Sequence, residues 1–174
     1  MKNIVLIGFT GVGKTTIGRR VAAKLKMEFC DTDEAIFRCE KMPVHELLQK
    51  KGPKYFEGAQ RFAVSTLAQN QGVVISTGGD TVMDAFNVAA LQENGILFWL
   101  KADSTSVYQN TRRSVARRPG LAGAGLLEIE TMMNEREVHY QKADVTISVV
   151  QNDIDAIADE IIANYKKLTE GENK

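Results

Sequence analysis

The sequence predicts an α/β fold in which helices cover both faces of a parallel sheet. Two observations lead to this expectation: short apolar runs rich in β-branched residues, and longer segments between them with helical spacing of apolar residues. The length of 174 residues and the hydrophobic content of 44% suit one globular domain with a sizeable core. We expect that domain to span residues 1–168, followed by a polar C-terminal tail, 169–174, that frays.

Five apolar runs are the expected strands. The first is fully apolar and ends at Gly8, which is typical of a central strand buried on both faces. The expected strands are Ile4–Ile7, Glu28–Cys30, Val73–Ile75, Ile96–Leu100 and Val145–Val149.

The segments that separate these strands have helical periodicity. Pro43 and Pro53 flank a short helical piece, and Asp103 and Asp153 are suitable N-caps. The expected helices are Lys14–Lys26, Ala35–Cys39, Val44–Lys50, Tyr55–Gln69, Met83–Gln92, Ser104–Arg113, Leu126–Gln141 and Ile154–Lys167. The stretch Arg112–Gly125 carries four arginines, one proline and three glycines with little periodicity, which predicts a mobile loop.

Composition and charge exclude several classes of protein. The formal net charge is zero, which argues against a dedicated nucleic-acid binder. The two cysteines, Cys30 and Cys39, are too few for a disulfide framework, and we expect reduced thiols in a cytoplasmic protein. The apolar runs are too short to span a bilayer, so we expect no membrane partner.

The strongest single motif lies between the first expected strand and the first expected helix. Residues Gly8–Thr15 (GFTGVGKT) match G-x-x-x-x-G-K-[ST], the phosphate-binding P-loop. Its glycines let the backbone N–H groups surround phosphates, Lys14 would reach the β- and γ-phosphates, and the Thr15 hydroxyl would bind Mg²⁺. The predicted nucleotide-binding residues of this segment are Gly11, Val12, Gly13, Lys14, Thr15 and Thr16.

Two further motifs follow expected strands, where ligands of open α/β sheets bind. Asp31 and Asp33 come after the second strand, and their carboxylates can serve Mg²⁺ or orient an acceptor hydroxyl and take its proton. An equally good account makes them favourable acids at a helix N-terminus. Thr77–Gly79 follows the third strand. In one interpretation its backbone contacts the same ligand as the two acids, and in the other it only forms a structural turn.

The order of four motifs resembles the shikimate kinase family. They are the P-loop Gly8–Thr15, Asp31-x-Asp33, Thr77–Gly79, and Glu-Arg-x-x-x-Tyr at Glu135–Tyr140, and the similarity runs from about residue 1 to 162. The resemblance implies a P-loop kinase fold with three layers, α/β/α, a five-stranded parallel sheet and a mobile lid at about 112–125. It also implies transfer of the γ-phosphoryl group of ATP to the 3-hydroxyl of shikimate, on the route to chorismate and the aromatic amino acids.

The same resemblance implies roles for individual residues. Thr15 and Asp31 would contact Mg²⁺, Asp33 would act as the base for the acceptor hydroxyl, and Arg136 would grip the acceptor carboxylate. Arg118 would swing with the lid over the transferring phosphoryl group and also contact the nucleotide. The catalytic residues are then Lys14, Asp33 and Arg118, and the substrate-binding residues are Asp33, Gly78, Gly79 and Arg136. We expect a monomer whose partners are ATP and a small-molecule acceptor, shikimate or a related polyol.

The chain departs from the family pattern on the acceptor side. Where the family has Phe-Arg and, three residues after the arginine, Glu, this chain has Phe56, Glu57 and Gln60. The third glycine of the family's Gly-Gly-Gly turn is Asp80, and the arginine near the adenine is replaced by Asn110.

Glu57 and Asp80 leave the identity of the acceptor open. Acids near the acceptor carboxylate would repel it, which favours a related polyol without a carboxylate or with an amine, or a non-catalytic nucleotide-binding module. Alternatively, Glu57 pairs with Arg61 at the i, i+4 spacing of a helix and faces solvent. Arg61 or a lid arginine would then bind the acceptor carboxylate in place of the family's arginine, and shikimate would remain the acceptor.

Overall fold

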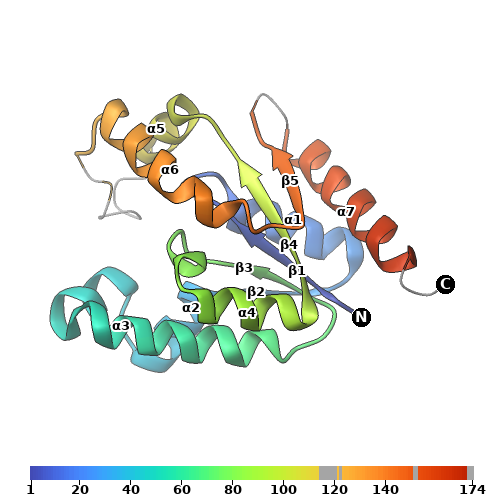
Figure 1. Cartoon of the computed structure of the whole chain (residues 1–174), viewed down its shortest axis with the longest axis horizontal. Helices are drawn as coiled ribbons and strands as arrows, with labels where there is room; N and C mark the ends of the chain where they lie inside the picture. Colours follow the sequence, from blue (N-terminus) through green and yellow to red (C-terminus); the bar gives the residue numbers. More distant parts are fainter. Residues whose placement is uncertain (114–120, 122, 151–152, 172–174) are drawn as a thin grey trace.

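The computed structural model describes residues 1–113, 121, 123–150 and 153–171 (Figure 1). Its centre is a five-stranded parallel sheet, which confirms the prediction, and the strand order is β2-β3-β1-β4-β5. The strands are β1 (Asn3–Ile7), β2 (Glu28–Asp31), β3 (Val73–Ser76), β4 (Gly95–Lys101) and β5 (Val145–Ser148).

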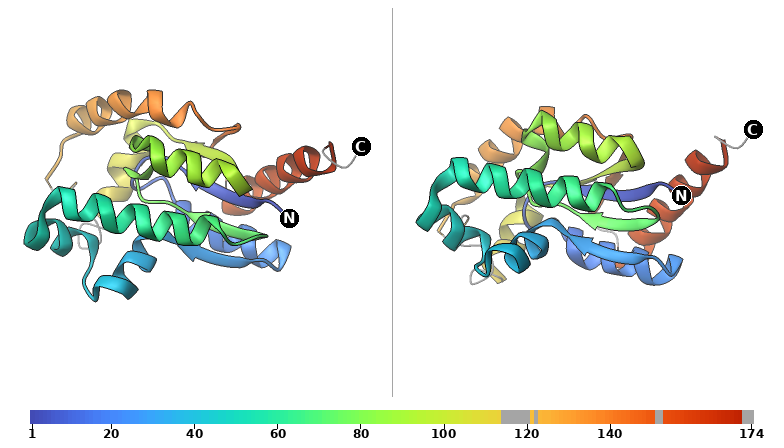
Figure 2. Two further views of the ribbon diagram at one scale, coloured as in Figure 1. Left: turned by 60° about the horizontal axis from the view of Figure 1, so that its bottom comes forward. Right: turned by 90° about the horizontal axis from the view of Figure 1, so that it is seen from below.

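Helices cover both faces of this sheet. They are α1 (Lys14–Leu25), α2 (Thr32–Glu40), α3 (Val44–Ala68), the 3₁₀ helix η1 (Thr81–Met83), α4 (Ala85–Asn94), α5 (Ser104–Arg113), α6 (Leu126–Tyr140) and α7 (Ile154–Glu170). Helices α1 and α7 pack together on one face, and α3 and α4 pack together on the other (Figure 2). In the described part of the chain, no helix is both long and apolar enough to cross a membrane.

Strand β1 forms the middle of the core. It pairs with β3 and β4, with Val5 opposite Ile75 on one side and Leu97 on the other, and all five of its residues are buried. Its one polar residue, Asn3, bonds to backbone groups at the start of β3, accepting from the N–H of Val73 at 3.1 Å. The prediction of a buried central strand is confirmed, because an all-apolar run suits only a position covered on both faces.

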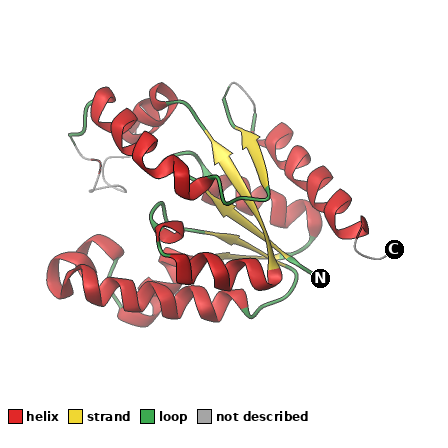
Figure 3. Cartoon of the chain, viewed as in Figure 1, coloured by secondary structure: helices red, strands yellow, loops and turns green. Residues whose placement is uncertain are grey.

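The carboxyl ends of the parallel strands lie at one edge of the sheet (Figure 3). The loops that follow β1 and β3 meet there with the first turn of α2, which follows β2 directly. The N-terminus and the end of α7 lie toward the opposite edge (Figure 1). The fold therefore brings the P-loop, Asp31–Asp33 and Thr77–Gly79 to one place, although they are far apart in the sequence.

Several helix boundaries differ from the predicted ones because polar side chains cap them. Helix α2 begins at Thr32 rather than Ala35, since Asp31 accepts hydrogen bonds from the N–H groups of Asp33 and Glu34. Helix α4 likewise begins after Asp84, whose carboxylate accepts from the N–H of Phe86 at 2.9 Å. Met83, predicted as the start of that helix, belongs to η1.

Two other expectations need a change of boundary. The two helices predicted at 44–50 and 55–69 are joined as α3 but separated by a kink at Gly52, where φ is 82° and ψ is 170°. Helix α7 continues to Glu170, three residues beyond the predicted end at Lys167, so the expected frayed tail does not begin at Thr169. The Thr169 hydroxyl donates to the carbonyl of Tyr165 at 2.9 Å and thus bonds to the preceding turn.

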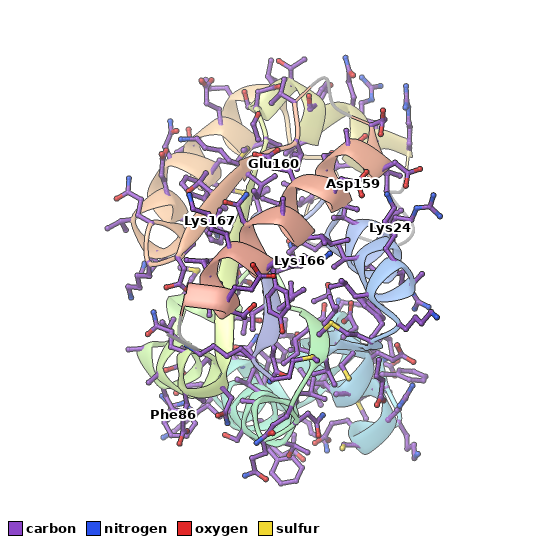
Figure 4. The ribbon with its side chains drawn as sticks, turned by 90° about the vertical axis from the view of Figure 1, so that its right-hand side faces the viewer. Lys24, Phe86, Asp159, Glu160, Lys166 and Lys167 are labelled. Carbon is purple, nitrogen blue, oxygen red and sulfur yellow. The ribbon has the colours of Figure 1, made fainter. Side chains whose placement is uncertain are left out.

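Ion pairs connect α1 to α7 on the outer surface. Lys24 lies beside Asp159, with Nζ 2.7 Å from Oδ1, and also approaches Asp155 at 2.9 Å (Figure 4). Arg20 and Lys24 donate to Asp155 and lower the pKa of its carboxyl to about 2. These groups are solvent-exposed, so the apolar contacts beneath them contribute most of the stability of this helix pair.

Two glycine-to-alanine changes are expected to shift stability in opposite directions. A Cβ at Gly95 would lie 2.5 Å from the Leu91 carbonyl oxygen and 2.7 Å from Val5 Cγ2, so Gly95→Ala should lower the free energy of unfolding by about 1–3 kcal/mol. Gly58 is an exposed helical position with nothing within 4 Å of an added Cβ, so Gly58→Ala should raise it by about 0.5–1 kcal/mol. Urea unfolding measures both changes. A Gly95→Ala variant with the same midpoint as the unaltered chain would contradict the packing described for Gly95.

Candidate active site

The P-loop joins β1 to α1 through backbone conformations that favour glycine. Gly8 has φ 144°, and a Cβ there would lie 2.7 Å from the carbonyl oxygen of Leu100. Gly13 is the N-cap of α1 with φ 100°, and it has no side chain to bond the first amides of the helix. N–H groups in this position, at the positive end of the helix dipole, are suited to binding an anion.

Lys14 is the first residue of α1, and its side chain lies over the P-loop. Although it carries a charge, it is only 7% exposed, and Nζ donates to the carbonyl oxygens of Gly8 at 2.7 Å and Phe9 at 2.9 Å. Asn110 of α5 donates from Nδ2 to the carbonyl of Gly11 at 3.1 Å. The residue that replaces the family's adenine-side arginine therefore contacts the P-loop itself.

Asp31 connects the P-loop helix to α2. Its Oδ2 accepts a hydrogen bond from Thr15 Oγ1 at 3.1 Å, while Oδ1 accepts from the N–H of Asp33 at 2.9 Å. The two interpretations of Asp31 are therefore compatible. Its Oδ1 caps helix α2, while its Oδ2 lies beside Thr15, where the metal ion is predicted. A hydroxyl and a carboxylate are hard oxygen ligands of the kind Mg²⁺ prefers, so the donor set fits that ion.

Asp33 lies in the first turn of α2 and faces the turn after β3. A Cβ at Gly78 would be 2.9 Å from Asp33 Oδ1, so the carboxylate and this turn are in close contact. Solvent reaches Asp33 from the mouth of the cleft, but surrounding protein atoms partly desolvate its carboxylate. This desolvation, with the charge of Asp31 and despite that of Lys14, raises the pKa of Asp33 to about 6.

The turn after β3 is held from both sides by side chains for which sequence reasoning assigned no role. Thr32, fully buried, accepts from the N–H of Gly78 at 3.0 Å, and Tyr140 donates from its hydroxyl to the carbonyl of Gly79 at 2.7 Å. Tyr140 also stacks on Trp99, with ring centroids 5.8 Å apart. Two features of the sequence could have identified these residues. Thr32 stands between the two acids of Asp31-x-Asp33, and Tyr140 is the last residue of the Glu-Arg-x-x-x-Tyr motif.

The P-loop, the two acids Asp31 and Asp33, and the turn after β3 line one cleft of about 350 Å³. The predicted residues that line it are Gly11, Gly13, Lys14, Thr15, Thr16, Asp31, Asp33, Gly78 and Gly79, joined by Thr10 and Thr77. Val12 does not line this cleft, because its side chain is buried beside Phe9 in a neighbouring cavity. Arg118 and most of the predicted lid lie outside the described residues.

Arg136 of α6, predicted to bind substrate, does not line the cleft itself. It lies beside the cleft, next to the turn after β3, where it pairs with the residue that follows Gly79. Its guanidinium stacks over the ring of Phe9, 5.1 Å from the centroid, and its side chain is 18% exposed. Nη1 pairs with Asp80 Oδ1 at 2.9 Å. The arginine expected to grip a carboxylate therefore already contacts one from its own chain.

Glu57 and Arg61 form the i, i+4 pair that one of the two interpretations predicts. Arg61 Nη2 lies 2.9 Å from Glu57 Oε1, and the Glu57 side chain is 52% exposed. Arg61 also donates to Asp84 at the start of α4, from Nε to Oδ2 at 2.6 Å. Neither residue lines the cleft, so Glu57 does not place its charge there, and Arg61 is bound to α4 rather than presented to a ligand.

The contact between Gly79 and the P-loop leaves no room for a side chain. A Cβ at Gly79 would overlap Thr10 Oγ1 and lie 3.1 Å from the Thr10 nitrogen. Gly79→Ala is expected to lower kcat/KM about 10-fold by displacing one wall of the cleft against the other. Steady-state kinetics check this, with Gly58→Ala as the control. Thr10→Ala should restore part of the loss in the double variant, and a change below twofold for Gly79→Ala would contradict the contact.

Comparison with known proteins gives one consistent result. The protein-family model described as Shikimate kinase matches residues 10–166. Shikimate kinase of Caldanaerobacter subterraneus subsp. tengcongensis is 37% identical over 168 residues, which cover 97% of this chain and 98% of the relative. Shikimate kinase of Thermoanaerobacter pseudethanolicus is 35% identical over 171 residues, which cover 98% and 100%.

A solved structure agrees in fold over the full length. Shikimate kinase from Acinetobacter baumannii, in complex with shikimate, superposes with a TM-score of 0.86 at 26% identity, covering 100% of this chain and 96% of the other. The P-loop kinase fold predicted from the motif order is thereby confirmed. With the cleft formed by those same motifs, the matches establish that this chain belongs to the shikimate kinase family.

Proposed function

We propose that the chain transfers the γ-phosphoryl group of ATP to the 3-hydroxyl of shikimate. The main observation is the single cleft in which the P-loop with Lys14 faces Asp33 and Gly78–Gly79. A phosphate site and a carboxylate of raised pKa in one cleft suit phosphoryl transfer to a hydroxyl. The acceptor is inferred from the family, whose relatives bear the name shikimate kinase and one of whose solved structures contains shikimate.

On the nucleotide side, the chain supplies positive charge and backbone donors. The amides from Gly11 to Thr16 and the N-terminus of α1 would bind the β- and γ-phosphates. Lys14 would exchange its bonds to the loop carbonyls for bonds to the phosphate oxygens, where charge accumulates during transfer. Thr15 and Asp31 would hold Mg²⁺, which neutralises phosphate charge when bound.

On the acceptor side, Asp33 would orient the 3-hydroxyl and take its proton. Gly78 and Gly79 present backbone to the acceptor without side chains that would exclude it. Arg136 would bind the acceptor carboxylate, since a guanidinium pairs with a carboxylate through two parallel hydrogen bonds. We also propose that the protein acts as a monomer in the cytoplasm, where ATP is available to it.

The test is ATP consumption with identification of the product. The chain is incubated with Mg²⁺ and ATP together with shikimate, quinate or aminoshikimate, and phosphorus NMR identifies the phosphorylated position. We expect ADP and shikimate 3-phosphate, with quinate and aminoshikimate turned over more slowly. If none of the acceptors is phosphorylated, the kinase function is contradicted. If another acceptor is phosphorylated faster than shikimate, that acceptor is the substrate in place of shikimate.

A further inference from the structure

The ion pair between Asp80 and Arg136 joins an acid that departs from the family pattern to the proposed carboxylate-binding arginine. Arg136 is held in place by Phe9 and is largely buried, so its guanidinium is a preformed carboxylate site. Asp80 fills that site with a carboxylate oxygen 2.9 Å from Nη1. A substrate carboxylate that approaches the same face of Arg136 therefore meets one already bound.

We propose that Asp80 is a specificity-determining residue that competes with the carboxylate of the acceptor for Arg136. The inference rests on the proposed function and deepens it, because it concerns acceptor selection at the same site. An acceptor whose carboxylate binds through Nη1 of Arg136 must first displace Asp80. An acceptor of the same shape without a negative charge gains little from Arg136 and has no need to displace Asp80.

Asp80, rather than Arg136, is the partner free to move. The Asp80 side chain is 56% exposed and makes no capping hydrogen bond to the short helix η1 that it precedes. Asp84, four residues later, shows what a fixed acid looks like. Its side chain is only 18% exposed, and its carboxylate caps helix α4. The carboxylate of Asp80 can therefore rotate into solvent without loss of secondary structure, while Arg136 stays over Phe9.

The position of Asp80 also agrees with an effect on the acceptor site. Its charge contributes to the raised pKa of Tyr140, whose hydroxyl bonds to the carbonyl of Gly79. Asp80 thus acts electrostatically on the turn against which we place the acceptor.

The proposal predicts a charge-dependent gain in affinity. Asp80→Asn keeps the size of the side chain and removes the competing charge. It is expected to lower the KM for shikimate about 5-fold, the size of effect measured for partly exposed ion pairs. The KM for the uncharged methyl ester or carboxamide of shikimate should change less than twofold, and the KM for ATP should not change.

The experiment compares the unaltered chain, Asp80→Asn and Glu57→Gln with shikimate and its carboxamide at pH 8. Glu57→Gln is the matched control, because it removes an acid that pairs with an arginine outside the cleft. Thermal unfolding of each variant checks that the fold is kept. Turnover of shikimate by the unaltered chain establishes the kinase function independently of the variants, so its failure is distinct from failure of the Asp80 proposal.

Three results would overturn the proposal. An unchanged KM for shikimate in Asp80→Asn shows that the ion pair does not compete. An equal decrease for the acid and the carboxamide shows an effect of shape rather than charge. An increase in the KM for shikimate shows instead that Asp80 holds Arg136 in its binding position.

Discussion

Replacing Lys14 by methionine is expected to lower kcat by about three orders of magnitude while the chain remains folded. Methionine keeps the length and apolar stem of the side chain but removes the ammonium group that would bind the transferring phosphoryl oxygens. Loss of one such preorganised donor in a water-excluded site lowers rates by about 10²–10³-fold. Lys14 combines the donor with a full charge, so we expect the upper end of that range.

The best control for this change lies on the same helix. Lys24→Met removes a lysine from the far end of α1, where Nζ pairs with exposed acids of α7. It should leave kcat within twofold. Single-turnover kinetics with saturating ATP separate the chemical step from nucleotide binding, and circular dichroism checks the fold. A Lys14→Met variant that retains a tenth or more of the kcat would show that the backbone donors suffice.

Asp33→Asn should lower kcat about 10²–10³-fold with a smaller change in the KM for shikimate. Asparagine can still bind the acceptor hydroxyl, but it cannot take the proton, and general-base catalysis contributes about 10²–10⁴-fold. In the unaltered chain the charges facing Asp33 are those of Asp31 and Asp80, which raise its pKa, and Lys14, which lowers it. The resulting pKa of about 6 means that the rate should rise with pH and level off above about 6.

The same pKa has a consequence for stability with a definite sign. The folded chain holds the Asp33 proton more tightly than the unfolded chain, whose pKa is near 3.8. Ionisation of Asp33 therefore destabilises the fold as the pH rises from about 4 to about 6, and the destabilisation persists above that range. Asp33→Asn should thus be less active but unfold at a higher urea concentration at pH 8.

Carbon NMR of the carboxyl groups and urea unfolding check this pair of expectations, with Glu34→Gln as the neighbouring control. Glu34 is on the same helix, exposed, and paired with Arg38. An Asp33 that titrates near 4, together with unchanged stability in Asp33→Asn, would contradict the effect of the cleft on its pKa. If Asp33→Asn keeps kcat within threefold of the unaltered chain, Asp33 is not the base.

Local patterns predict the parts of the fold whose cause is local. An all-apolar run suits only a covered strand, which identifies β1, and the spacing of glycines and Lys14 identifies the P-loop. The predicted N-caps Asp103 and Asp153 are confirmed, since each accepts a hydrogen bond from an amide in the first turn of its helix. The boundaries that Asp31 and Asp84 set differ from the predicted ones, because whether such a residue caps a helix depends on the direction of its carboxylate. A motif gives the residue type but not this direction.

The order of strands and motifs predicts that the P-loop, Asp31–Asp33 and Thr77–Gly79 meet, but the individual side-chain contacts between distant segments could not be predicted from the sequence. Tyr140 and Gly79 are 61 positions apart and meet only because α6 packs beside the turn after β3. The pairing of Asp80 with Arg136 has the same origin. The i, i+4 pair of Glu57 with Arg61 could be predicted, because helix geometry alone brings such residues together.

The two helices that begin at the cleft give it an electrical polarity that is independent of any single side chain. Helix α1 has no acid in its own first turn and Gly13 as its N-cap, so its N-terminus keeps a positive partial charge, with one Asp31 oxygen against Thr15 as the nearest acid described. Helix α2 has Asp31 as its N-cap and Asp33 and Glu34 in its first turn, and these three carboxylates outweigh its own dipole. An anion is therefore attracted to one side of the cleft and repelled from the other. For the proposed reaction, this gradient orients the phosphate chain toward α1 before any lid closes.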